Sequence, residues 1–520
     1  MDYLMGIDLG TSRVKSMLID TGGKTVGFGA VEYGIDSPRP GFAEQPPDTW
    51  WRAAAAAVSK ALAAASGAGV APGEIRGIGM SGQMHGLVAL DRAGLPVRPA
   101  VIWADQRSGA QVGRMSEQLG RDTLARVMRN RAATGFFLPS LLWIMENEPD
   151  VYSRIAKAVL PKDFIRLRLC GELSTEVTDA SATLAFDVAG QRWAVEPVER
   201  MGVDSGLLPF CRNPVDRCGG VTKEAASLTG LSEGTPVFAG GGDQPMQAVG
   251  SGVISEGTVS LNIGTAGQLS TPVSAPSTDR LLRTHTFCHA PRDTWYIMGA
   301  ILNGGLALGW IAERVLGEPD FGRLDAEAAS VGPVPHGLVF LPYLVGERTP
   351  HFDPRARGVF FGLGLRHEKG HLVRAVMEGV VFALRDSLEI MRSLGVEVDS
   401  VTASGGGASS SLWRQIQADI LNVPVKRSVV DEQACMGAAL TAGVGAGVFS
   451  TYGEACAQTV RPSSETVEPY PDRVSRYEEG YRIYREIYPR SRHLFGGSPE
   501  ETAADNGAAA SGAAGQEVGS

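Results

Sequence analysis

The segment Leu4-Met5-Gly6-Ile7-Asp8-Leu9-Gly10-Thr11-Ser12 has a counterpart far along the chain, in Val259-Ser260-Leu261-Asn262-Ile263-Gly264-Thr265-Ala266-Gly267. Each copy combines an apolar run, which predicts a strand, with a Gly-Thr loop that leads into a second apolar run. Two such hairpins, one near the start of each half, predict a duplicated fold. The alternative is a chance repetition of a strand and a Gly-Thr turn.

The two copies differ at one informative position, because Asp8 of the first corresponds to Asn262 of the second. Backbone amides and hydroxyls of the first loop can point at a phosphate, and the Asp8 carboxylate can hold Mg²⁺ through water. A single metal site between two similar domains would show this asymmetry. An ordinary hairpin with an Asp-Gly turn remains the alternative.

A second stretch, Ala239-Gly240-Gly241-Gly242-Asp243-Gln244, places a carboxylate directly after three glycines. Glycines carry no side chain, so a ligand can approach the backbone closely, and Asp243 can take a proton as a general base. We expect an open loop followed by an apolar helix over residues 246–253. A tight turn with a solvated aspartate is the other interpretation.

A third glycine-rich stretch, Gly405-Gly406-Gly407-Ala408-Ser409-Ser410-Ser411, lies between a predicted strand (401–404) and a predicted helix (412–421). Unpaired amides and the helix dipole make such a junction a platform for anions and nucleotides. The stretch lacks the lysine of a P-loop, so that class of nucleotide site is not indicated. The small-residue helix expected over residues 434–447 is predicted to pack against this loop.

Two further loops have the residue types that bind sugars. Ser81-Gly82-Gln83-Met84-His85-Gly86 can present Gln83 and His85 to a polyol, although a lone histidine in a turn is more often solvated. In Val101-Ile102-Trp103-Ala104-Asp105-Gln106-Arg107, the Trp103 ring suits the C–H face of a sugar and the charged groups suit its hydroxyls. Asp105 could equally be the N-cap of a helix. Gly346-Glu347-Arg348-Thr349-Pro350-His351 is expected to be an exposed polar turn.

Length and composition limit the class of protein. A chain of 520 residues with 43% hydrophobic residues predicts two domains with large cores, and we place the boundary near residues 252–257. The net charge of −9 and the lack of Lys/Arg runs argue against nucleic acid or anionic lipid as the main partner. A small-molecule ligand fits better.

The remaining compositional signals concern location. The six cysteines show no metal-ligand spacing and no secretory signal is evident, so a cytoplasmic protein with reduced thiols is expected. The uncharged span 294–312 contains Asn303 and several glycines, and we expect a buried helix with a glycine-lined turn there instead of a membrane span. The Gly/Ala/Ser-rich tail 496–520 is predicted to be disordered.

Taken together, these stretches resemble the FGGY family of carbohydrate kinases, and within it the xylulokinases. The resemblance covers about residues 5–489 and includes the family's second signature over residues 358–378. Besides the Asp8 hairpin and the three glycine-bearing loops, the lines that carry it are Gly82-Gln83-Met84-His85-Gly86, Leu160-Pro161-Lys162-Asp163, His285-Thr286-Phe287-Cys288-His289, Leu341-Pro342-Tyr343-Leu344 and Gly346-Glu347-Arg348-Thr349-Pro350-His351.

The resemblance implies an α/β protein of two actin-like (ribonuclease H-like) ATPase domains, residues 1–252 and 253–495, flanking a central cleft. It also implies ATP and Mg²⁺ as cofactors, and phosphorylation of a ketopentose, with D-xylulose the first candidate. The catalytic residues would be Asp243 and Asp8, with Asp8 at the metal. The sugar would contact Gln83, Met84, His85, Trp103, Asp105, Asp243 and Gln244. The nucleotide would contact Thr11, Ser12, Lys15, Gly264, Thr265, Gly305, Gly406, Gly407 and Ser411.

Several alternatives stay open at this point. The substrate could be another ketopentose or pentitol, such as ribulose, L-xylulose, arabinitol or xylitol. An actin-like ATPase that acts on a protein partner would leave the loops at 82–86 and 103–107 without a purpose, and a non-catalytic sugar sensor would not need Asp8 and Asp243. The chain departs from the family at Ser140, where a lysine is usual, and at Gln244, where some xylulokinases have asparagine. The oligomeric state is open, with a homodimer among the options.

Overall fold

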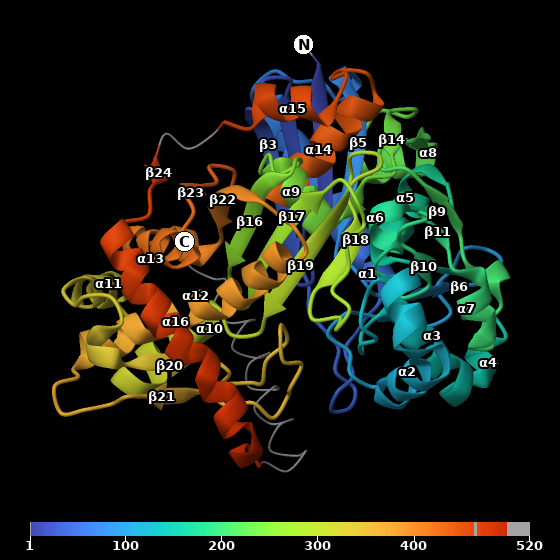
Figure 1. Ribbon diagram of the computed structural model, residues 1–520. Helices are drawn as coiled ribbons and strands as arrows, with labels where there is room; N and C mark the ends of the chain where they lie inside the picture. The colour runs from blue at the N-terminus through green and yellow to red at the C-terminus, as the bar shows by residue number, and fades with distance from the viewer. Residues whose placement is uncertain (1, 462–464, 497–520) are drawn as a thin grey trace.

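The computed structural model describes residues 2–461 and 465–496. The chain forms an α/β fold built on two seven-stranded mixed sheets (Figure 1). The order of the first sheet is β13 (Arg217–Gly220), β14 (Pro236–Phe238), β5 (Ile75–Gly82), β1 (Tyr3–Leu9), β2 (Arg13–Asp20) and β3 (Thr25–Glu32), with β15 (Gly241–Gly242) paired to β5. The order of the second is β18 (His285–Cys288), β19 (Trp295–Ile301), β17 (Gly267–Val273), β16 (Gly257–Ile263), β22 (Val398–Ser404), β23 (Val425–Arg427) and β24 (Thr466–Val467).

The two sheets repeat one topology, which confirms the predicted duplication. In the first, β1 is antiparallel to β2 and parallel to β5. In the second, β16 is antiparallel to β17 and parallel to β22 in the same way. A further antiparallel strand follows each hairpin in its sheet, β3 beside β2 and β19 beside β17.

Helices cover both sheets. In the first half these are α1 (Pro47–Ser66), α2 (Gly109–Thr123), α3 (Phe137–Asn147), α4 (Pro149–Tyr152), α5 (Pro161–Cys170), α6 (Val177–Ala180), α7 (Val195–Arg200), α8 (Lys223–Thr229) and α9 (Asp243–Gly250). In the second half they are α10 (Gly305–Gly309), α11 (Phe321–Ala329), α12 (Lys369–Ser393), α13 (Ser411–Leu421), α14 (Gln433–Gly445), α15 (Tyr452–Thr459) and α16 (Pro471–Ser491).

Short two-stranded pairs complete the fold. They are β4 (Glu44–Gln45) with β7 (Ala100–Val101), β6 (Val88–Leu90) with β8 (Lys157–Val159), β9 (Ser174–Glu176) with β12 (Phe210–Arg212), β10 (Phe186–Asp187) with β11 (Arg192–Trp193), and β20 (Val339–Leu341) with β21 (Val359–Phe361).

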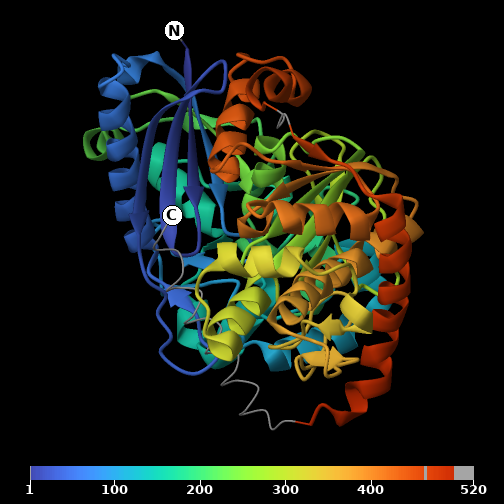
Figure 2. The ribbon, with the colours of Figure 1, turned by 90° about the vertical axis from the view of Figure 1, so that its left-hand side faces the viewer.

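Helix α14 packs on the first sheet, not on the 405–411 loop as the sequence suggested. It lies against β1, β5 and α9, and its side chains share an apolar core with residues from β1, β2 and α15. Glycine makes this approach possible, because a Cβ at Gly6 would lie 1.9 Å from the carbonyl oxygen of Cys435. Figures 1 and 2 show α14 and α15, in orange-red, beside the blue strands of the first half. The predicted boundary at residue 252 falls between α9 and β16, but the chain later returns to the first sheet.

The span 294–312 is not one buried helix. Residues Trp295–Ile301 form strand β19, because aromatic and β-branched side chains fit a buried sheet, and a glycine-lined turn then leads to α10. No helix in the described parts of the chain combines the length and apolarity needed to cross a membrane. All six cysteines are free thiols, as expected. The predicted disordered tail lies, apart from Gly496, outside the described residues.

Candidate active site

A cavity of about 530 Å³ lies where loops of the two sheets meet. Asp8 of β1, Asp243 and Gln244 of α9, and Gly405 and Gly406 after β22 all contribute to its lining. The acid of the first hairpin, the glycine-aspartate loop and the third glycine loop therefore converge on one space, although more than 160 residues separate neighbouring members in sequence. Asp8 and Asp243, the two predicted catalytic acids, thus line the same cavity.

Strand register explains why Asp243 lies close to Asp8. Asp8 pairs with Ser81 of β5, and Ser81 pairs in turn with Gly241 of β15, two residues before Asp243. The Ser81 hydroxyl donates to Asp8 Oδ1 at 2.8 Å. The sheet therefore brings the two carboxylates to one edge, where β1, β5 and β15 end side by side.

Asp243 is not on an open loop. It is the first residue of α9, partly buried in the cavity wall, and Gly242 is the N-cap. Burial, followed by the negative charge of Asp8, raises the pKa of Asp243 to about 7, and hydrogen bonds from Gln244 oppose the shift. A carboxylate that titrates near neutral pH is suited to accept a proton.

Asp8 is almost fully buried and has a cation across the hairpin. Burial raises its pKa, while Lys15, its partner on β2, and Ser81 act in the opposite direction. Lys15 Nζ lies 2.6 Å from Glu432 Oε2. Burial lowers the pKa of Lys15, but Glu432 and Asp8 outweigh this effect and raise it. Lys15 therefore stays charged at the cavity wall, paired with Glu432 and attracted by the charge of Asp8.

The site fits Mg²⁺ only as a partner of the nucleotide. Among the described residues there is no group of three or more His, Cys, Asp or Glu side chains placed to hold a metal. Mg²⁺ commonly takes one or two protein carboxylates and completes its shell with phosphates and water. Asp8 and the cavity beside it match that pattern.

The loop of the second hairpin rests on the start of α10. Gly264 O accepts the amide of Gly305 at 2.6 Å, and Thr265 O accepts the amides of Gly304 and Leu306 at 3.0 and 3.1 Å. The Gly305 amide is thus used within the protein and is not available to a nucleotide. Its predicted contact with ATP stays a prediction, whereas the exposed Thr265 can reach a ligand.

The third glycine loop packs on the same hairpin. Gly405 has φ 74°, and a Cβ at Gly407 would lie 2.6 Å from the Ile263 side chain, so neither position accepts a larger residue easily. The helix behind the loop, α13, starts at Ser411 and is capped by Ser410, whose hydroxyl accepts the Trp413 amide at 3.0 Å. The predicted strand, glycine turn and helix N-terminus are confirmed.

The loop after β5 faces the glycine-aspartate loop. Met84 is buried against Gly242, where an added Cβ would lie 2.7 Å from its Cγ. Gln83 is buried, and its amide donates to Gln45 Oε1 at 3.0 Å. Its own Oε1 has no hydrogen-bond partner within the described ranges. These contacts place the loop directly beside Asp243.

His85 is not solvated. Its Nδ1 donates to Ala182 O at 2.8 Å, and its ring packs on Phe136 with centroids 4.0 Å apart. Burial lowers the pKa of His85 to about 4, so the ring is neutral near pH 7. Because Nδ1 carries the proton, Nε2 is left as an acceptor for a ligand hydroxyl.

Trp103 and Asp105 have different roles. Trp103 is partly exposed, and its Nε1 donates to Thr11 Oγ1 at 2.9 Å, which joins the predicted sugar loop to the predicted phosphate loop. Asp105 is buried; it accepts the Ala43 amide at 2.7 Å and pairs with Arg107 at 2.7 Å. The N-cap of α2 is Ser108, so Asp105 is not a helix cap. The carboxylate of Asp105 has almost no exposed surface, which does not favour the predicted contact with a sugar.

The turn 346–351 was predicted to be exposed, and no residue of it was assigned to the site. Glu347 is buried instead of exposed and accepts the amides of Leu302 and Arg348 at 2.9 and 2.7 Å. Burial raises the pKa of Glu347 to about 8. The charge of Arg348 contributes to the low pKa values of His85 and His285. This arginine belongs to the second half of the chain, so the second half adds positive charge near His85 of the first half. The signals in the sequence were the Glu-Arg pair after a predicted strand and the place of this turn among the lines that carry the family resemblance.

The comparisons with known proteins agree with this geometry. Residues 3–250 match the family model for the N-terminal domain of FGGY carbohydrate kinases, and residues 253–446 match that for the C-terminal domain. The chain is 36% identical to a xylulose kinase of Bacillus subtilis over 89% of this chain and 92% of that protein. It is 38% identical to a xylulose kinase of Lactococcus lactis over 87% of this chain and 89% of that protein.

Among solved structures, a Brucella ovis protein described as a xyloylose kinase superimposes with a TM-score of 0.89. It is 34% identical, and the match covers 95% of this chain and all of that one. Similarity thus extends over both sheets and the cavity between them.

Proposed function

This chain belongs to the FGGY family of carbohydrate kinases and is xylulose kinase-like, and from this membership and the cavity geometry we propose that it phosphorylates D-xylulose to D-xylulose 5-phosphate. ATP use follows from the family. The observation that carries the proposal is the placement of Asp243, whose pKa is about 7, beside Asp8 in a cavity bounded by loops of both sheets.

Asp243 accepts the proton of the terminal sugar hydroxyl as this oxygen attacks the γ-phosphorus. The position of Asp243 at the N-terminus of α9 and beside Gln244 fixes the carboxylate relative to the backbone. Since its pKa is near 7, the group is a stronger base than an ordinary aspartate and is still largely ionised slightly above neutral pH. The chain therefore both orients the nucleophile and removes its proton.

The loop 83–85 holds the sugar next to this base. Met84 provides an apolar surface over Gly242, and neutral His85 offers Nε2 as an acceptor for a hydroxyl. The unpartnered Gln83 Oε1 gives a second buried acceptor close by. This combination of one apolar contact and a few fixed acceptors is typical of polyol recognition.

The glycine loop at 405–407, Ser411 and the second hairpin would hold the nucleotide, and Thr11 and Ser12 would contact its phosphates. Mg²⁺, bound with ATP near Asp8, would neutralise charge on the phosphates. Asp8 holds its position for this through Ser81 and Lys15. Homodimer formation and a cytoplasmic location stay predictions; sedimentation and cell fractionation check them.

A coupled assay of ADP release over D-xylulose, ribulose, L-xylulose, arabinitol and xylitol tests the proposal. We expect D-xylulose to have the highest kcat/KM. Asp243→Asn removes the base while keeping size, and we expect sugar-dependent turnover to fall about 10³-fold or more. Ser330→Ala changes an exposed residue at the end of α11 and should keep normal turnover, so it controls for effects of substitution and purification. Normal turnover by Asp243→Asn would refute the base assignment, and preference for another sugar would refute the substrate.

A further inference from the structure

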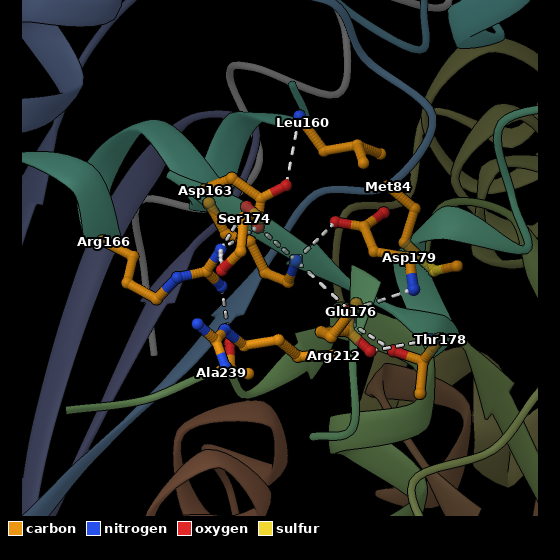
Figure 3. A network of polar contacts seen from close by, with 12 residues as sticks. Met84, Leu160, Asp163, Arg166, Ser174, Glu176, Thr178, Asp179, Arg212 and Ala239 are labelled. Atoms are coloured by element: carbon orange, nitrogen blue, oxygen red, sulfur yellow. Dashed lines mark hydrogen bonds and ion pairs between the residues drawn. The ribbon is translucent and has the colours of Figure 1, made fainter. Parts of the chain in front are cut away.

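A cluster of buried charges lies beneath α6, next to the glycine-aspartate loop. It consists of Lys162, Asp163 and Arg166 of α5, Glu176 at the end of β9, and Asp179 of α6, and we refer to it as the α6 cluster. All five side chains have no exposed surface. Figure 3 shows Asp163, Arg166, Glu176 and Asp179 with dashed lines for the hydrogen bonds and ion pairs among the residues drawn.

Lys162 is the centre of the α6 cluster. Its Nζ lies 2.9 Å from Asp163, 3.2 Å from Glu176 and 3.1 Å from Asp179. Arg166 lies 3.1 Å from Asp163. Two cations therefore bridge α5 to β9 and α6, and they fix the position of a helix only four residues long.

The cluster holds both ends of the glycine-aspartate loop. Arg166 Nη1 donates to Ala239 O at 3.0 Å, at the start of the loop (Figure 3). At the other end, Gly242 N donates to Thr178 Oγ1 at 3.0 Å, one residue before Asp243. Thr178 is itself fixed because Glu176 accepts its amide at 2.6 Å and that of Asp179 at 3.0 Å.

The turn after α6 contacts two further parts of the active-site region. Ala182 O accepts His85 Nδ1, which sets the tautomer of that ring. Ser181 Oγ accepts the amide of Cys288 at 3.0 Å, and Cys288 belongs to β18 of the second sheet. One short segment, 176–182, therefore touches the acid loop, the histidine loop and the other half of the molecule.

Stability alone does not account for so many buried charges. Desolvation offsets most of the attraction within buried ion pairs, and apolar side chains of similar volume often stabilise as well. Charged pairs restrict the relative position and orientation of their partners, because each pair has a narrow range of favourable geometries. The α6 cluster is therefore better suited to fixing positions than to adding stability.

We propose that the α6 cluster positions the active site, with Thr178 as the positioning residue that sets where Asp243 lies through its bond to Gly242. Thr178 acts through the backbone and does not touch the reacting atoms. The proposal deepens the function above and rests on it, since it takes Asp243 as the base.

Thr178→Val tests it, because the substitution keeps the shape of the side chain and removes the hydroxyl. We expect sugar-dependent kcat to fall about 10- to 100-fold, as for a small displacement of a catalytic group, with little change in KM for ATP. The share of ATP hydrolysed without sugar phosphorylation should rise. Thr178→Ser restores the acceptor and should recover most of kcat.

Thr229→Val is the matched control. Thr229 is also buried and its hydroxyl also accepts a backbone amide, that of Leu231 at 3.2 Å, but it lies at the end of α8. It should lose stability and keep kcat and the coupling ratio. If Thr178→Val behaves like Thr229→Val, the proposal is wrong.

Hydrogen exchange covers the case in which Thr178→Val does not fold. In the unmodified protein the Gly242 amide should exchange slowly, and rapid exchange would overturn the proposed bond. The role of Asp243 as the base is tested separately from the role of Thr178, by the kinetics of Asp243→Asn. Loss of activity there with normal Thr178→Val kinetics leaves Asp243 as the base and removes only the positioning role of Thr178.

Discussion

The two hairpins of this protein share one backbone and differ in charge. Lys15, Asp8 and Ser81 lie in register across three strands of the first sheet. Gln268, Asn262 and Ser404 occupy the same places in the second. The first triad carries two opposite charges, on Lys15 and Asp8, and the second has neutral side chains of similar size. The two copies of the fold therefore differ in charge at matching positions.

The neutral triad is suited to a different task. Asn262 and Ser404 line the same cavity as Asp8, but they bring no charge to it. A nucleotide with several negative charges can approach that side without repulsion, while the charged triad would face the site of phosphoryl transfer that we propose. Substitutions that exchange the two characters therefore test the comparison.

The largest effect is expected from Asp8→Asn, which gives the first triad the amide of the second. We expect kcat to fall about 10²- to 10³-fold, because a charged group that organises the transition state is lost. The acid limb of the pH profile should also move to lower pH, since the charge of Asp8 helps raise the pKa of Asp243. Steady-state kinetics with D-xylulose measure both. An unchanged kcat would show that the two triads are interchangeable.

The pH dependence of the unmodified protein comes next. Asp243 must be ionised to accept a proton, and its pKa is raised to about 7. Sugar-dependent kcat should therefore rise with pH through about 7 and fall about tenfold per unit well below it. Rates at saturating sugar and ATP give the profile, with KM for D-xylulose as the internal control. A flat profile from about pH 6 to 8 contradicts the assigned base.

Asn262→Asp is the reverse exchange and should have an intermediate effect. A carboxylate at this position would repel the phosphates of a nucleotide bound as we propose, so we expect KM for ATP to rise about tenfold with a smaller change in kcat. Asn262→Ala removes the amide without adding charge and serves as the control. Equal KM values for ATP in the two variants would mean that the functional difference between the triads does not come from charge.

Lys15→Gln should have the smallest effect. The substitution introduces the residue type of Gln268 and breaks the ion pair with Glu432. The Lys15 side chain is 18% exposed and the Glu432 side chain is 24% exposed. Because solvent screens part of this interaction, we expect a loss of about 0.5–1 kcal/mol in the free energy of unfolding. Urea denaturation measures it. Arg490→Gln, in an exposed helical pair with Glu486, should cost less, and the reverse order would contradict the argument.

Features encoded within a few residues were predictable from the sequence. The hairpin loops at 10–12 and 264–266, the glycine turn at 405–407 and the helix after it depend on local backbone chemistry, and all were found as expected. The convergence of Asp8 and Asp243 followed from the resemblance and the repeat. Strand register, which sequence does not reveal, supplies its physical cause.

Features that depend on distant partners were not predictable. Asp105 was predicted to contact the sugar or to cap a helix, but its oxygens are used by Ala43 and Arg107. Glu347 was predicted to be exposed, but it is buried and accepts the Leu302 amide. Helix α14 is apolar on every side, so no amphipathic stripe indicated which surface it covers. The line Leu160-Pro161-Lys162-Asp163 carries part of the family resemblance, but its role depends on contacts with Glu176 and Asp179.

The return of α14 to the first sheet has a consequence for biosynthesis. The face of β1 and β5 that it covers is completed only when residues near 445 have left the ribosome, long after the strands themselves have been made. Until then the nascent first half carries an uncovered apolar surface, which is where chaperones bind and where aggregation starts. A chain that stops before residue 433 would keep that surface permanently.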